Sequence, residues 1–133
     1  MVFVFMSVFD PQFNATALLA RLETSNGLVV ACYCAQWCRS CTEYRPAFDA
    51  LAARWPQHTF AWIDIEESPE LLDDEDVENF PTILMQSPGG NVFFGAMLPH
   101  VSHLERLIER YDEKTPALGQ GPGPLRQLLS SAT

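Results

Sequence analysis

The sequence predicts an α/β sandwich built on a mixed β-sheet. Strand and helix patterns alternate along most of the chain, a continuous apolar run leads directly into a long helix pattern, and a hairpin pattern precedes the last long helix. Alternation of this kind is typical of a sheet covered by helices. The 133 residues, of which 47% are hydrophobic, suit one compact domain with a core of its own.

The first half of the chain carries two helix patterns around a buried strand. Residues 15–23 have leucines at helical spacing, with Asn14 as the expected N-cap and Gly27 as the expected stop. Residues 28–34 form an uninterrupted apolar run, which is typical of a strand buried on both faces. Residues 38–55 then repeat an apolar stripe at helical spacing, so we expect a long helix directly after that strand.

The second half continues with a strand, a hairpin and a final helix. Residues 59–65 are expected to form a second central strand, and residues 69–79 a short acidic helix with a solvated face. Residues 82–86 and 92–94 pair around a Ser-Pro-Gly-Gly turn. Residues 101–111 form an amphipathic helix.

A change in composition divides the chain near its end. We assign residues 1–112 to one domain and residues 113–133 to a Gly/Pro-rich C-terminal tail. Its Gly/Pro-rich stretch, which ends before the brief apolar segment 125–129, is expected to hold neither a helix nor a central strand. The tail is expected to be loose. The alternative is that Leu125, Leu128 and Leu129 dock onto the body of the domain or onto a partner.

Charge and hydropathy restrict the classes of partner. Eight Lys plus Arg against seventeen Asp plus Glu give a net charge of −9, which argues against nucleic acid and against an anionic membrane surface. No stretch approaches the ~20 apolar residues of a membrane span. The apolar segment 1–9 is short and has neither a preceding Lys or Arg nor a small-residue cleavage site. We therefore expect a cytoplasmic protein, in which cysteines are more often catalytic or metal-binding than structural.

The segment Trp37-Cys38-Arg39-Ser40-Cys41 lies at the junction of the buried strand and the long helix. One helical turn separates the Cα atoms of Cys38 and Cys41 by roughly 5 Å, inside the range of about 4.4–6.8 Å that a disulfide accepts. Cys38 meets the positive end of the helix and the cation of Arg39, both of which favour the thiolate. Cys41 lies one turn further in and can resolve a mixed disulfide formed at Cys38.

Residues 28 to about 110 resemble the thioredoxin family. The resemblance rests on separated motifs, which are Ala35-Gln36-Trp37-Cys38-x-x-Cys41, Pro46, Ile63-Asp64-Ile65, Phe80-Pro81-Thr82 and Phe94-Gly95-Ala96. It implies a three-layer α/β/α sandwich around a central mixed sheet. It also implies that Cys38 is the nucleophile and Cys41 the resolving thiol.

The resemblance assigns substrate-binding roles as well. Pro81 would be a cis-proline facing the sulfurs, and the backbone of Phe80 would pair with an extended substrate peptide. Trp37 would flank the sulfurs, and Gly95 would let a neighbouring loop approach. Independently of the resemblance, the position of Tyr44 and Arg45 just past the cysteines predicts either a part in the docking surface or a place facing solvent.

The sequence departs from the family at several positions. Arg39-Ser40 replaces the common Gly-Pro and is expected to tune the couple to be more oxidising than typical thioredoxin. Cys32 stands where the family has a buried Asp, Cys34 where it has Trp, and Trp62 where it has Lys. Cys41 consequently has no evident base.

Cys32 and Cys34 are two residues apart on a strand and point to one face. We expect them to fill core space as small apolar thiols. The alternative is a regulatory or metal role shared with Cys38 and Cys41. The turn from strand into helix would scatter four sulfurs away from a tetrahedron, so no metal is expected. The three histidines are expected to lie on the surface.

These features predict an enzyme of the thiol–disulfide oxidoreductase class, acting in electron transport and redox homeostasis. It would reduce or exchange the disulfides of protein substrates through Cys38 and Cys41, without a bound cofactor, and an upstream disulfide reductase would restore the dithiol. The alternative is a thioredoxin-fold binding or chaperone module whose CxxC motif is vestigial or acts as a sensor.

Overall fold

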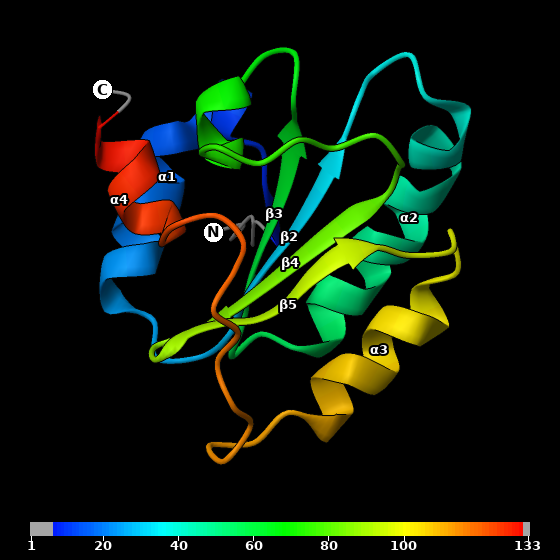
Figure 1. Ribbon diagram of the computed structural model, residues 1–133. Helices are drawn as coiled ribbons and strands as arrows, with labels where there is room; N and C mark the ends of the chain where they lie inside the picture. Colours follow the sequence, from blue (N-terminus) through cyan, green and yellow to red (C-terminus); the bar gives the residue numbers. More distant parts are fainter. Residues whose placement is uncertain (1–6, 132–133) are drawn as a thin grey trace, which may run out of the picture.

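The computed structural model describes residues 7–131. In it, a five-stranded mixed sheet lies between two layers of helices (Figure 1). The strands are β1 (Val8–Phe9), β2 (Val29–Cys34), β3 (Thr59–Asp64), β4 (Thr82–Ser87) and β5 (Gly90–Ala96). Their order across the sheet is β1-β3-β2-β4-β5. Strands β1 and β2 run parallel to β3, β4 runs antiparallel to β2, and β5 runs antiparallel to β4. The predicted sandwich around a mixed sheet is confirmed.

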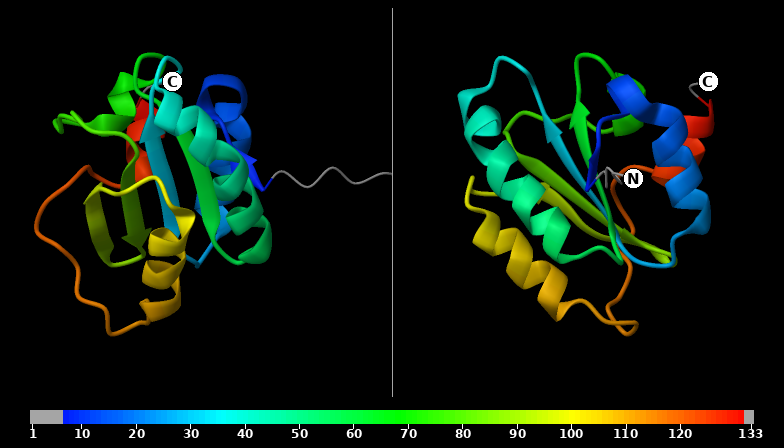
Figure 2. Two further views of the ribbon diagram at one scale, coloured as in Figure 1. Left: turned by 90° about the vertical axis from the view of Figure 1, so that its right-hand side faces the viewer. Right: turned by 180° about the vertical axis from the view of Figure 1, so that it is seen from behind.

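The helices divide between the two faces of this sheet (Figure 2). They are α1 (Pro11–Thr24), α2 (Arg39–Arg54), the short 3-10 helix η1 (Pro69–Leu72), α3 (Val101–Arg110) and α4 (Leu125–Ser131). Helices α2 and α3 cover one face, whereas α1, η1 and α4 cover the other. None of the helices between residues 7 and 131 has the length and apolar character that a membrane span requires.

Strand β2 is central to both halves of the core. Its neighbours are β3 on one edge and β4 on the other, and the helix layers bury both of its faces. Val30, Cys32 and Cys34 belong to the core under α2 and α3, whereas Ala31 and Tyr33 belong to the core on the opposite face. This alternation explains the uninterrupted apolar run and directs Cys34, the last residue of β2, toward α2.

The N-terminal region differs from the expectation in two ways. Val8 and Phe9 form an unpredicted edge strand that pairs with β3, while residues 1–6 lie outside the described part of the chain. Helix α1 begins at Pro11, with Asp10 as N-cap, earlier than the expected start at residue 15. Its backbone is interrupted at Asn14, whose φ of −139° and ψ of 44° are not helical, so a regular helix follows the expected cap position. Proline is favoured in the first turn of a helix because its fixed φ suits the helix and its missing N–H would be unpaired there.

The acidic segment after β3 forms less helix than expected. Only η1 is helical, and Asp73, directly after it, has a φ of 58°, so the predicted helix over residues 69–79 is wrong beyond Leu72. Consecutive carboxylates repel one another in a helix, which disfavours its continuation. The Asp73 carboxylate instead accepts a hydrogen bond of 3.0 Å from the backbone N–H of Gly123.

The C-terminal tail packs against the domain, and the expectation of a loose tail is wrong for α4. Leu125 and Leu129 are buried beside α1 and η1, and Leu128 packs against the same core. The backbone N–H of Leu125 donates to Oε1 of Gln86 over 3.1 Å, and Nε2 of Gln86 donates to the carbonyl of Gly123 over 2.9 Å. The tail thus covers the face that the missing acidic helix leaves open. The division of the chain at residue 112 stays a prediction.

Leu129→Ala is expected to lower the free energy of unfolding by about 2 kcal/mol, at the low end for a buried leucine because a terminal helix relaxes readily. Gln127→Ala on the exposed side of the same helix should change it by less than about 0.5 kcal/mol. Urea unfolding of the two variants measures the difference. Equal stabilities would show that α4 contributes nothing to the fold.

His58 makes the stability of the fold dependent on pH. Its Nδ1 accepts a hydrogen bond of 2.9 Å from the backbone N–H of Leu28, and its ring stacks on Trp55, so it is only partly exposed. Burial lowers the pKa of His58 below its ordinary value of 6.5. As the pH falls below 6.5, the unfolded chain therefore binds the proton first, and this contribution to stability is lost.

Wild type is accordingly expected to lose more stability than His58→Gln between pH 7.5 and pH 5.5. Urea unfolding at both pH values gives the comparison, with the exposed His103→Gln as the matched control. An identical pH dependence in wild type and His58→Gln would contradict the assignment.

Candidate active site

The cysteines gather where β2 ends and α2 begins. Cys34 closes β2, and Cys38 is the N-cap of α2 with extended φ and ψ of −83° and 118°. The backbone N–H of Cys38 donates to the carbonyl of Ala35 over 3.0 Å, and the N–H of Thr42 donates to the carbonyl of Cys38 over 3.2 Å. These bonds fold the connection into a tight turn, which places Cys41 in the first turn of α2 facing the sheet.

The structure pairs Cys41 with Cys34 and leaves Cys38 as a free, partly exposed thiol. The Cα atoms of Cys34 and Cys41 lie 5.8 Å apart, within the range that a disulfide accepts. Both residues are buried, with exposed fractions of 1% and 2%. The expected Cys38–Cys41 disulfide is therefore not the one formed, because Cys41 points inward to the last residue of β2. The interpretation of Cys34 as a core-filling thiol is also wrong.

Cys32 remains a buried thiol beside this disulfide. Its Sγ lies 3.6 Å from Sγ of Cys34. Since the disulfide sulfur of Cys34 carries no hydrogen, Cys32 is the donor in this contact. Burial raises the pKa of Cys32 far above its ordinary value, and the cation of Arg45 opposes this only in part. Cys32 thus stays protonated and fits the expected role of a small core side chain.

Trp37 and Phe80 form an aromatic surface next to the cysteines. The Trp37 side chain is 70% exposed, and its ring meets that of Phe80 nearly at right angles, with centroids 5.6 Å apart. Its Nε1–H donates to the carboxylate of Glu66. The Phe80–Pro81 peptide bond is cis, the form that the resemblance implies, and the carbonyl of Pro81 accepts a hydrogen bond of 3.0 Å from Met97.

The remaining residues of the expected site are Gly95, Arg39 and Ser40. Gly95 pairs with Ile83 in the β4–β5 ladder. A Cβ at Gly95 would meet only the Phe93 ring, at 3.7 Å. The close approach of a neighbouring loop that was expected at this position is therefore not found. Arg39 extends into solvent, and its Nε donates to Glu43 over 3.1 Å, while Ser40 is half-buried. Their tuning of the redox couple stays a prediction.

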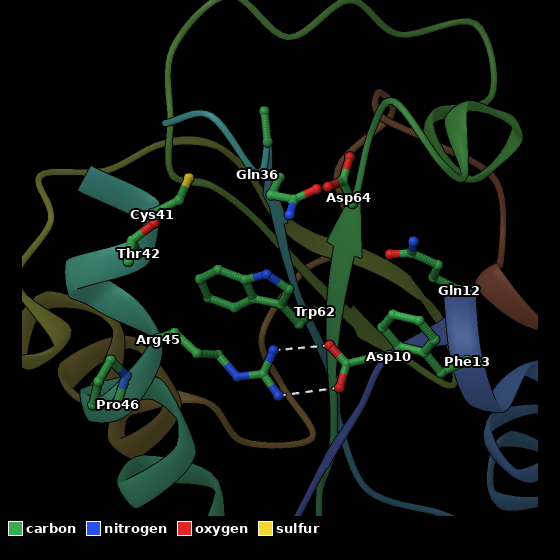
Figure 3. Close-up of a pocket in the computed structure, with 11 residues that line it drawn as sticks. Asp10, Gln12, Phe13, Gln36, Cys41, Thr42, Arg45, Pro46, Trp62 and Asp64 are labelled. Carbon is green, nitrogen blue, oxygen red and sulfur yellow. Dashed lines mark hydrogen bonds and ion pairs between the residues drawn. The ribbon is translucent and has the colours of Figure 1, made fainter. Parts of the chain in front are cut away.

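A pocket of about 430 Å³ lies between α1, α2 and β3, and Cys41 forms part of its wall (Figure 3). The guanidinium of Arg45 crosses it, with Cζ 5.1 Å from the ring centroid of Trp62. Two hydrogen bonds of 2.8 and 3.1 Å join this guanidinium to the Asp10 carboxylate, and a third of 2.8 Å joins it to Asp49. Burial opposes the charge of Arg45, but these bonds outweigh it and raise its pKa.

Arg45, expected either in a docking surface or facing solvent, instead lies half-buried over the Trp62 ring, and its charge acts on Cys32. It lies on α2, whereas the family position for a lysine is occupied by Trp62 on β3. Tyr44 is buried and does not contribute to a docking surface. In the part of the chain that the structure describes, no group of three or more His, Cys, Asp or Glu side chains is arranged to hold a metal ion.

Comparisons with known proteins agree with this geometry. The family model described as thioredoxin matches residues 10–106. Thioredoxin of Chlamydia trachomatis is 31% identical over 87 residues, which cover 65% of this chain and 85% of the relative. Thioredoxin 1 of Plasmodium falciparum is 28% identical over 90 residues, which cover 66% and 84%.

Solved structures show the same architecture. Thioredoxin of Fasciola hepatica superposes with a TM-score of 0.65 at 26% identity, covering 80% of this chain and 100% of that one. Thioredoxin NaTrxh of Nicotiana alata gives 0.68 at 22% identity, covering 85% and 99%, and shows the fold alone. With a family match over most of its length, a mixed sheet of the same design and a cysteine pair at the strand–helix junction, the chain belongs to the thioredoxin family of thiol–disulfide oxidoreductases.

Proposed function

We propose that this protein reduces the disulfides of other proteins through Cys38 and Cys41. The observation that carries the proposal is a free, partly exposed Cys38 thiol at the start of α2, one turn from the buried Cys41 and beside the aromatic surface of Trp37 and Phe80. A reacting thiol has to be reachable by a substrate, and its resolving partner has to be close and shielded.

The proposed reaction moves two electrons from the dithiol to the substrate. The Cys38 thiolate attacks one sulfur of the substrate disulfide, a Cys38–substrate disulfide forms, and the other substrate sulfur leaves as a thiolate that takes a proton from water. The Cys41 thiolate then attacks the Cys38 sulfur and expels the second substrate thiol. The Cys38–Cys41 disulfide that results is returned to the dithiol by an upstream disulfide reductase, so no bound cofactor is needed. A reducing compartment such as the cytoplasm suits this cycle.

The surface beside Cys38 suits an extended peptide. In the part of the chain that the structure describes, the backbone N–H and carbonyl of Phe80 make no hydrogen bond, so both are available to a substrate strand. Strand addition of this kind holds a peptide by its main chain and tolerates varied side chains. In this proposal Trp37 flanks the bound peptide, and Pro81 and Gly95 are further substrate-binding residues.

Catalytic amounts of the protein are therefore expected to accelerate the reduction of insulin by dithiothreitol. Precipitation of the insulin B chain reports the rate. A rate equal to that of dithiothreitol alone, with a folded protein that still binds polypeptides, would favour a binding or chaperone module instead.

A further inference from the structure

We propose that Cys34 is a second resolving cysteine. After substrate turnover it forms a disulfide with Cys41 and thereby returns Cys38 to the thiol form. The proposal rests on the proposed function and names a further residue in its cycle. The carrying observation is that Cys41 is bonded to Cys34 while Cys38 is free.

Cys41 has two partners within reach. Its Cα is 5.8 Å from that of Cys34, and helical geometry sets it roughly 5 Å from that of Cys38, one turn away. All three residues contribute to one core cluster, with Cys38 at its edge. Because one sulfur holds only one disulfide bond, the Cys34 and Cys38 thiols compete for Cys41.

The transfer is an internal thiol–disulfide exchange. The Cys34 sulfur attacks Sγ of Cys41, the Cys34–Cys41 bond forms, the Cys38–Cys41 bond breaks, and Cys38 leaves as a thiolate. The proton of the Cys34 thiol passes to water or to the departing Cys38 sulfur. No electrons enter or leave the protein in this step, so no external oxidant or reductant is required.

Cys32 positions and assists Cys34 in this exchange. Its S–H group lies 3.6 Å from the Cys34 sulfur and is held as a thiol by burial. A hydrogen bond from this group stabilises the thiolate form of Cys34, which is the attacking species in this exchange and the leaving group in its reverse. Cys32 therefore acts through Cys34 and is a positioning residue.

The transfer changes what the oxidised protein exposes. The Cys34–Cys41 disulfide is buried on both sides, whereas Cys38 is partly exposed. The oxidised protein thus keeps a reactive surface thiol and hides its disulfide from reductants in solution. To be reduced, the disulfide must first return to Cys38 and Cys41 by the reverse exchange.

Peptide mapping of the oxidised full-length protein tests the proposal. The protein is oxidised with glutathione disulfide, its free thiols are alkylated under denaturing conditions, and trypsin then cuts after Arg39, between Cys38 and Cys41. The linked peptides 22–39 and 40–54 should carry alkyl groups on Cys32 and Cys38, and none on Cys34. Linked peptides with alkylated Cys34 and unmodified Cys38 in most molecules would overturn the proposal.

Alkylation of the native protein provides a second readout. Oxidised wild type should be alkylated at Cys38 within about twofold of the rate of the reduced protein, because its thiol is free in both states. Oxidised Cys34→Ala should react at least about tenfold more slowly, since Cys38 is then held in the Cys38–Cys41 disulfide. Equal protection of Cys38 in oxidised wild type and Cys34→Ala would overturn the transfer, and if this variant does not fold, the mapping of wild type decides.

Insulin reduction separates this proposal from the proposed function. If the Cys34→Ala variant reduces insulin but no longer frees Cys38 after oxidation, the result supports both the role of Cys34 and the proposed function. Cys34→Ala that behaves like wild type in mapping, labelling and turnover overturns only the role of Cys34. Loss of insulin reduction in wild type itself, with Cys34–Cys41 still formed on oxidation, overturns the proposed function and leaves the sulfur exchange standing.

Discussion

Cys38→Ser is expected to lose at least ~100-fold in the rate of insulin reduction, because a serine hydroxyl is neither ionised nor nucleophilic enough to open a disulfide. The fold should survive the change, since Cys38 lies at the N-cap of α2 and only at the edge of the core. Serine is moreover a preferred N-cap residue. The loss therefore reports chemistry rather than unfolding.

Ser102→Ala, an exposed change on α3, provides the activity control and should match wild type. Circular dichroism and urea unfolding check that Cys38→Ser is folded. A variant that is folded and still reduces insulin at the wild-type rate would remove Cys38 from the mechanism and direct attention to Cys34 and Cys41.

Phe48→Ala is expected to lower the free energy of unfolding by about 3–5 kcal/mol, the range measured for buried phenylalanines. Phe48 is fully buried, with an exposed fraction of 0%, and it anchors α2 on the sheet. Its ring centroid lies 5.7 Å from that of Phe60 and 5.6 Å from that of Trp62, both in edge-to-face contact. The cavity left by alanine would loosen the helix that carries Cys41.

Phe13→Ala provides the matched control. Phe13 is 80% exposed on α1, so the same substitution removes little buried surface and should cost less than about 0.5 kcal/mol. Urea unfolding of both variants, in the same redox state, measures the difference. Similar losses for the two variants would contradict the packing described for α2.

The alternation of strands and helices could be predicted because its signals are local. The apolar run of β2 and the apolar stripe of α2 follow from burial against neighbours, and both elements lie within a residue or two of the expected bounds. Strand β1 escaped prediction because two residues give no periodicity. Its apolar side chains become a strand only through pairing with β3.

The acidic segment and the tail show where local reasoning fails. Residues 69–79 have helical periodicity, but charge repulsion and the contact of Asp73 with Gly123, 50 positions away, decide otherwise. Leu125, Leu128 and Leu129 form a brief apolar segment in a polar tail, and their docking onto the domain was only the alternative expectation. Leu125 and Leu129 are buried because α1 and η1 leave a face of the sheet to be covered, which no local signal reports.

The sequence identifies the strand–helix junction at which the cysteines gather, but not their pairing. The spacing of Cys38 and Cys41 identifies the junction, and the motif around Phe80 and Pro81 identifies the surface beside it. The signal for Cys34 was its position at the end of a buried strand, where alternate residues face α2. Spacing along the helix pointed to Cys38 as the partner of Cys41. The turn between β2 and α2 brings the Cα of Cys34 to 5.8 Å from that of Cys41, which is also within disulfide range.

The most direct test is to trap the first covalent intermediate. Cys41→Ser cannot resolve a mixed disulfide, so its complex with a peptide that contains one intramolecular disulfide should persist. Peptide mapping of that complex is expected to show the substrate linked to Cys38, with Cys32 and Cys34 free. A link to Cys34 or Cys32, or no link at all from folded protein, would contradict the account.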